Sequence, residues 1–187
     1  MSIATSGGPH LLTVGQLAEL PDDGLRHELI EGELTTMPPA GERHGSVAGR
    51  IAAYVGHHIL VNGLGRITGA ETGYLLRRNP DTVRAPDFAF TSIDRLSGPP
   101  DRTFSPIVPD LVVEVASPSD RLADVTRKAL MWLDAGVRLV WVVEPETEVV
   151  IVHRPGDAVT LLRGADAMLS GEDVVPGFAV HLHEIFG

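Results

Sequence analysis

The longest regular pattern of apolar and polar positions in the chain lies between residues 42 and 62. Its apolar side chains recur mostly at three- and four-residue steps, which is the period of one face of an α-helix. These positions are Val47, Ile51, Tyr54, Val55, His58, Ile59 and Leu60. Gly63 follows them, and glycine readily adopts the left-handed conformation that is common after a last helical turn. The pattern therefore predicts a long amphipathic helix.

Two further helices are predicted from the same period. Thr13 is a suitable N-cap for a short helix that ends at Pro21. A longer helix is expected from about residue 120 to residue 134, with Ser117 or Ser119 as its N-cap and Gly136 after its end. The apolar stripe of this helix consists of Leu122, Val125, Ala129, Trp132 and Leu133.

Short apolar runs between turn residues predict the strands. Four of these runs are nearly continuous, which favours strands buried on both faces of a sheet. They are residues 110–116, 139–143, 148–153 and 159–162. Shorter strands are expected at 65–70 and 72–77, before a polar turn at 79–82. Another is expected at 85–90, before a proline-rich loop at 94–108. A β-hairpin is expected at 28–37, with its turn at Glu31 and Gly32.

The order of these elements predicts the fold class. Strand, helix and strand over residues 110–143 are typical of a right-handed crossover between parallel strands. The expected fold is therefore α/β, with a mixed β-sheet flanked by helices and an N-terminal β-hairpin. The 187 residues show no shift in composition. We accordingly expect one domain at 11–187 after a disordered N-terminus at 1–10.

One residue interrupts the central apolar run. Glu114 lies in the middle of the segment PDLVVEVASPSDR, which spans residues 109–121. A carboxylate in a buried strand is costly unless a cation, a metal or hydrogen-bond donors accompany it. Two interpretations remain open: a buried salt bridge, with Arg121 or Arg127 as the partner, or a ligand in a cleft.

Composition and charge narrow the function. The net charge of −10 argues against a protein that coats nucleic acid through a broad basic surface, but it allows a local basic cleft or a cation-binding site. The chain has no cysteine, which excludes disulfides and thiolate metal sites. It shows no targeting segment and no run of membrane-spanning length, so we expect a cytoplasmic protein. Fourteen of its fifteen basic residues are arginine, and the single lysine is Lys128.

Three residues suggest chemistry. Asp87 follows a proline in a short strand, Glu114 lies in the central strand, and Lys128 borders the apolar stripe of the next helix. Two carboxylates on neighbouring strands can share one Mg²⁺ or Mn²⁺ ion, with water in the remaining positions. A lysine beside the ion can orient or deprotonate a water molecule. Taken singly, Asp87 is more simply a turn residue, and Lys128 is more simply a lysine at the edge of a buried face.

The ordered set resembles a known family. Asp87, Glu114 and Lys128 resemble the pattern of the PD-(D/E)XK nuclease superfamily. More closely, RHELIEGEL, His44, APDFAF, PDLVVEVASPSDR with Lys128, and GVRLVWVVEP are similar, in this order, to a bacterial putative restriction endonuclease family of that superfamily. The resemblance covers about residues 13–186. The chain departs from the superfamily pattern at Ala116, where a lysine is usual. In the resembled family that lysine lies on the adjacent helix, which matches Lys128.

The resemblance implies a restriction endonuclease-like core that hydrolyses DNA phosphodiester bonds with Mg²⁺ or Mn²⁺. In this interpretation Asp87 and Glu114 bind the metal, Lys128 activates water, and Glu28 is an accessory acid. His44, Arg84 and Arg121 are predicted to contact the substrate, with Arg43 and Arg127 as weaker candidates. We also expect a homodimer, since an acidic chain needs help to hold DNA. The alternative is a non-catalytic module that keeps the nuclease fold for nucleic-acid binding or dimerisation.

Overall fold

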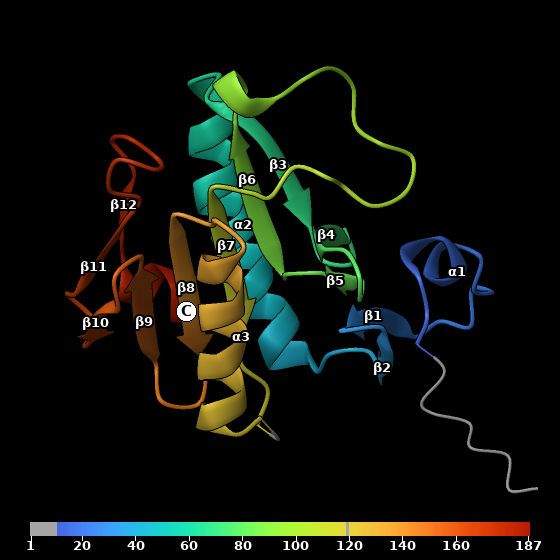
Figure 1. Cartoon of the computed structure of the whole chain (residues 1–187). Coiled ribbons are helices and arrows are strands. Elements are labelled where there is room, and N and C mark those ends of the chain that lie inside the picture. The colour runs from blue at the N-terminus through green and yellow to red at the C-terminus, as the bar shows by residue number, and fades with distance from the viewer. Residues whose placement is uncertain (1–10, 119) are drawn as a thin grey trace, which may run out of the picture.

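A six-stranded mixed sheet forms the centre of the computed structural model, which describes residues 11–118 and 120–187. Its strands are arranged in the order β10-β9-β8-β7-β6-β3 (Figure 1). They are β3 (Gly65–Gly69), β6 (Phe88–Ser92), β7 (Leu111–Val115), β8 (Leu139–Glu144), β9 (Val149–Arg154) and β10 (Ala158–Arg163). Among the strands of this sheet that the structure describes, only β7 and β8 run parallel, and α3 (Leu122–Asp134) connects them. The predicted α/β class with a mixed sheet is confirmed.

Each face of this sheet is covered by one long helix (Figure 1). On one face, α2 (Glu42–Val61) packs through Val47, Ile51, Val55 and Ile59. On the other face, α3 packs through Ala129 and Trp132. Strand side chains alternate between the two faces, so Val113 and Val115 face α2, whereas Val112 faces α3. Glu114 shares the α3 side with Val112, and this position defines what it can contact.

The predicted hairpin is confirmed and belongs to a smaller sheet. Strands β1 (Arg26–Ile30) and β2 (Glu33–Met37) are joined by a two-residue turn in which Glu31 has φ 54° and Gly32 has φ 84°. Positive φ at both positions is the turn geometry that matches the twist of a hairpin. The sheet order is β2-β1-β5-β4, with β4 (Tyr74–Arg77) and β5 (Thr82–Arg84). The helix α1 (Val14–Ala18), capped by Thr13 as predicted, packs on this sheet through Leu17.

Several local predictions were wrong. The strand β5 was missed because Thr82 was assigned to the end of a polar turn and Val83 and Arg84 to no element, yet all three are buried. The strand β10 was predicted to be buried, but it is an edge strand with an exposed face. The helix α3 begins at Leu122, and its N-cap residue, Arg121, makes no capping hydrogen bond through its side chain. Ser119 and the predicted disordered residues 1–10 lie outside the described residues.

The C-terminal region, after the last strand of the central sheet, forms a small sheet and a short helix. A two-stranded sheet of β11 (Met168–Ser170) and β12 (Ala179–His181) precedes α4 (Leu182–Phe186). Leu169, Leu182 and Ile185 from this region are buried in the core on the α2 side. A short 3-10 helix, η1 (Ile93–Arg95), follows β6. None of the helices formed by residues 11–118 and 120–187 is long and apolar enough to cross a membrane.

Candidate active site

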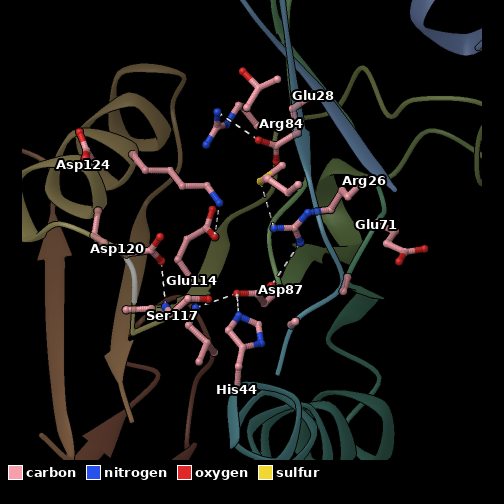
Figure 2. Close-up of a pocket in the computed structure, with 18 of the residues that line it drawn as sticks. Arg26, Glu28, His44, Glu71, Arg84, Asp87, Glu114, Ser117, Asp120 and Asp124 are labelled. Carbon is pink, nitrogen blue, oxygen red and sulfur yellow. Dashed lines mark hydrogen bonds and ion pairs between the residues drawn. The ribbon is translucent and has the colours of Figure 1, made fainter. Parts of the chain in front are cut away.

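A cleft of about 1760 Å³ opens between the two sheets. One wall is formed by the face of the β1–β2 hairpin that is opposite to the face packed against α1. The beginning of α2 and the side of α3 that includes Lys128 form the remaining walls, and the end of β7 lies between them. Alternate hairpin residues Arg26, Glu28 and Ile30 line the cleft together with Thr35 and Met37. Figure 2 shows Asp87 and Glu114 in the middle of this cleft, with His44 rising from α2.

Glu114 occupies the α3 side of β7 and is 4% exposed. Lys128 Nζ donates to its Oε2 at 2.6 Å, and Trp132 Nε1 donates to its Oε1 at 2.7 Å. Burial raises the pKa of Glu114, and the nearby charge of Asp87 raises it further, while Lys128 and Trp132 lower it in part. Neither arginine considered from the sequence is its partner: Arg121 is exposed, and Arg127 binds Asp124 at 2.7 Å.

Asp87 lies directly before β6 and is not a simple turn residue. Its Oδ2 accepts a hydrogen bond from the Val115 backbone N–H at 2.8 Å, which ties it to the end of β7. Arg26 Nη1 lies 3.4 Å from Oδ1, and His44 Nε2 lies 3.3 Å from Oδ2. Burial would raise the pKa of Asp87, but the interactions with His44, the Val115 N–H and Lys128 outweigh it and lower the pKa.

His44 is the third residue of α2 and is half-buried against Asp87. The interaction with the Asp87 carboxylate raises the pKa of His44, although burial and the charge of Arg26 oppose this. The imidazole therefore carries positive charge more readily than in water, and it lies beside an ionised carboxylate. A cationic histidine at this position could donate to a bound anion from the mouth of the cleft.

Glu28 forms a second buried pair with Arg84. Glu28 is 0% exposed, its Oε1 accepts the Ala85 N–H at 2.8 Å, and its Oε2 lies 3.1 Å from Arg84 Nη1. The Oε2 contact is an ion pair without the alignment of a hydrogen bond, and Arg84 Nε also lacks a hydrogen-bond partner. Because both groups are buried, each depends on the other for charge balance. This pair holds β1 against the segment that leads to Asp87.

The structure brings most of the predicted site residues to one cleft and leaves two outside it. The residues that line it are Glu28, His44, Arg84, Asp87, Glu114, Arg127 and Lys128. Arg121 is not among the lining residues, and Arg43 extends away from the cleft to Glu146 and Glu148. The sequence analysis missed Arg26, which contacts Asp87, and the Trp132 indole, which contacts Glu114. Trp132 lies one helical turn after Lys128, on the same side of α3. A lysine predicted to reach Glu114 therefore indicated that the Trp132 side chain could reach it too.

The donor set of the cleft fits one hard divalent cation. Across residues 11–118 and 120–187, no group of three or more His, Cys, Asp or Glu side chains is arranged to bind a metal. Of the two buried carboxylates, Glu114 lies in β7, and Asp87 lies directly before β6, the strand that pairs with β7 through Phe88 and Val113. Each carboxylate oxygen can accept more than one bond, and Mg²⁺ is commonly held by one or two carboxylates while keeping several waters. A site of this kind needs no third side chain.

A family model for the putative restriction endonucleases known as Uma2 matches residues 14–183. The chain belongs to the Uma2 family. No curated protein sequence matches it. The fold is shared with a crystal structure described as a putative nuclease belonging to DUF820, from Anabaena variabilis. The two chains are 19% identical, with a TM-score of 0.80 over 94% of this chain and 97% of the other. The expected restriction endonuclease-like family and fold are therefore confirmed for this Uma2 chain.

The two buried glutamates are expected to respond differently to neutralisation. Glu114→Gln should leave the apo protein about as stable as the wild type or more so. The charge of Glu114 is disfavoured by burial and by Asp87, and Lys128, with 18% of its side chain exposed, can be hydrated. Glu28→Gln should cost roughly 3–5 kcal/mol, because it leaves the buried Arg84 guanidinium unpaired. Urea denaturation in metal-free buffer measures both. A loss for Glu114→Gln as large as that for Glu28→Gln would favour a structural salt bridge at Glu114.

Proposed function

We propose that this Uma2 chain is a metal-dependent endonuclease that hydrolyses DNA phosphodiester bonds. The observation that carries the proposal is the convergence of Asp87, Glu114 and Lys128 in one cleft, with Lys128 Nζ 2.6 Å from Glu114 Oε2. Membership in a family described as putative restriction endonucleases supports the same reaction class. DNA is the proposed substrate, and a cytoplasmic location stays a prediction.

Asp87 and Glu114 are the residues that would hold Mg²⁺ or Mn²⁺. Such an ion, when bound, would stabilise negative charge on the phosphate and lower the pKa of water. The fixed neighbours of each carboxylate limit its freedom: the Val115 N–H orients Asp87, and the Trp132 indole orients Glu114. Both carboxylates are therefore pre-positioned before any ligand arrives, which reduces the entropy lost on binding.

Lys128 is proposed to act on the attacking water. An ammonium group has three donors, and one of them is used by Glu114 Oε2. The remaining two can hold the water or a phosphate oxygen at a fixed place beside the carboxylates. The low polarity of the surrounding core strengthens such contacts, since Trp132 and Ala129 on the same helix are fully buried. His44 and Arg26, on the far side of Asp87, are proposed to contact the phosphate backbone, and Glu28 is proposed as the accessory acid that supports this wall.

Arg84 and Arg121 occupy different positions in this proposal. Arg84 is bound to Glu28, so we propose that its role is to hold the wall of the cleft, with phosphate contact secondary. Arg121 is exposed at the start of α3 and would meet DNA only outside the cleft. The sequence-based prediction of substrate contacts thus becomes a secondary role for Arg84 and a contact outside the cleft for Arg121.

One observation favours the non-catalytic alternative. Acidic side chains outnumber basic ones among the residues that line the cleft. The acidic residues are Glu28, Glu31, Glu71, Asp87, Glu114, Asp120, Asp124 and Asp134. The basic residues are Arg26, Arg77, Arg84, Arg127 and Lys128. A polyanion would therefore need bound metal ions to offset the negative charge of the cleft. As a separate point, we propose that the enzyme acts as a homodimer.

Removal of the metal tests the proposed activity directly. Supercoiled plasmid incubated with the pure protein and Mn²⁺ should be converted to open-circular and linear forms. Excess chelator should stop the reaction, and Mn²⁺ added beyond the chelator should restore it, because the carboxylates alone cannot activate water. Plasmid that stays supercoiled with Mn²⁺ and with Mg²⁺ would favour the non-catalytic module.

A further inference from the structure

The strand β10 leaves one edge of the central sheet open. It is the last strand in the order β10-β9-β8-β7-β6-β3, and no described strand pairs with its outer side. Figure 1 shows it on the side of the molecule opposite the β1–β2 hairpin. An unpaired strand edge is a template for another strand, and proteins usually protect it with lysine, proline, bulges or a covering segment. Its pairing with β9 is regular over six residue pairs, and its sequence AVTLLR contains neither lysine nor proline.

The exposed face of β10 is apolar. Val159 is 55% exposed and Leu161 is 60% exposed. Since they are two residues apart, both point to the same face of the sheet. This face is on the α3 side of the sheet, because Leu161 pairs with Ile151, which packs in the α3-side core. The exposure of Val159 and Leu161 shows that α3 does not extend over them. On the opposite face, Thr160 Oγ1 accepts a hydrogen bond from Arg154 at 3.0 Å and is already satisfied.

A second copy of the same strand fits this edge best in one register. In an antiparallel pair, two directly opposed residues either both point their N–H and C=O groups towards the other strand or both point them away. This direction alternates along β10. Two copies of β10 can therefore pair only if opposed residues have numbers that are both even or both odd. Pairing centred on Thr160 meets this condition and places Leu161 opposite Val159 of the second copy. By the two-fold symmetry Val159 then lies opposite the second copy's Leu161. The four exposed apolar side chains cover one another.

The charges at the two ends of β10 agree with the same register. Asp157 precedes the strand and Arg163 ends it, and both are exposed. Neither forms an ion pair with any residue in the part of the chain that the structure describes. Centring on Thr160 brings Asp157, which lies in the turn before the strand with φ 58°, towards Arg163 of the other copy. A register shifted by two residues, centred on Leu161, would keep only Leu161 opposite its own copy. It would oppose Val159 to Arg163 and separate Asp157 from Arg163.

We propose that β10 pairs antiparallel with β10 of a second copy, so that two six-stranded sheets join into one continuous sheet. This interface rests on the homodimer in the proposed function, but it requires no nuclease activity. None of the β10 residues lines the cleft. The two clefts are therefore separate, and each subunit keeps its own complete set of Asp87, Glu114 and Lys128.

Sedimentation equilibrium of the full chain tests this interface. The wild type should show a mass twice the 20.0 kDa of one chain. Leu161→Lys should raise the dimer dissociation constant at least about 100-fold, because symmetry introduces two charges into the apolar contact. The matched control is Leu60→Lys, which places the same charge at an equally exposed leucine on α2 and should leave the constant unchanged. Mn²⁺ binding per subunit should be the same in all three proteins.

A charge exchange tests the register independently of the apolar contact. Asp157→Arg should weaken the dimer about tenfold by opposing like charges, and adding Arg163→Asp to it should restore wild-type affinity. A wild-type monomer at 100 µM, or a dimer that Leu161→Lys leaves intact, would overturn the interface. A double variant as weak as Asp157→Arg alone would overturn the register. Loss of Mn²⁺ binding in the Leu161→Lys monomer would contradict the claim that each subunit has a complete cleft of its own. Absence of DNA cleavage by the wild type would bear only on the proposed activity.

Discussion

Replacing Lys128 with arginine is expected to lower the rate of DNA cleavage by about 10²–10⁴-fold, the usual contribution of a positioned proton-transfer group. Lysine carries a compact point charge whose pKa shifts readily, whereas guanidinium is planar and stays protonated. Lys128 Nζ lies 2.6 Å from Glu114 Oε2, where a wider guanidinium would displace a neighbouring water. Lys128→Ala should be similarly inactive. Single-turnover cleavage with Mn²⁺ measures both rates.

The chain offers a matched control for this substitution. Arg127 precedes Lys128 and also lines the cleft, but 74% of its side chain is exposed and it binds Asp124. Arg127→Ala should therefore change the rate by less than about tenfold, through substrate binding alone. The Lys128 variants should still fold and bind Mn²⁺. Wild-type turnover by Lys128→Arg would remove Lys128 from the mechanism and leave the non-catalytic module as the better account.

Neutralising either buried carboxylate should weaken Mn²⁺ binding strongly. We expect Asp87→Asn and Glu114→Gln each to raise the dissociation constant by at least about 100-fold, since loss of groups that only support a ligand already costs 10–100-fold. Both substitutions keep the shape of the side chain and remove the charge that a hard cation requires. Isothermal titration of Mn²⁺ into the apo protein should show one site in the wild type.

Asp124→Asn is the control for the metal site. Asp124 also lines the cleft, but its side chain is 54% exposed and is bound to Arg127. Its neutralisation should leave Mn²⁺ affinity within a few-fold of the wild type. If the Asp87→Asn, Glu114→Gln double variant bound Mn²⁺ as tightly as the wild type, the assignment of the metal ligands would be wrong.

Local patterns in the sequence were enough to predict the elements that carry the site. The helix α2 follows from its three- and four-residue apolar period, and the hairpin follows from the Glu31–Gly32 turn between two short strands. The position of Lys128 near Glu114 also followed from local geometry, because a lysine bordering the buried stripe of α3 faces the strand beneath it. These features depend on neighbours within one helix or hairpin.

Other features depend on which strands lie side by side, and no local pattern contains that information. The sequence of β10 is as apolar as that of a central strand, so its place at the edge was not predicted. Thr82 was placed at the end of a polar turn, yet with Val83 and Arg84 it forms a strand that is buried because β1 and β4 flank it. Arg26 contacts Asp87 across 61 positions of sequence, and only the docking of the hairpin against the central sheet brings them together.

The central claim is that Asp87, Glu114 and Lys128 form one metal-dependent hydrolytic site. The most direct measurement compares metal occupancy with activity in a single preparation, by recording Mn²⁺ binding and plasmid cleavage over the same range of Mn²⁺ concentrations. We predict that the two curves rise together with one midpoint, and that both are lost in Asp87→Asn. Cleavage that persists without metal, or a cleavage midpoint more than about tenfold from the binding midpoint, would contradict the claim.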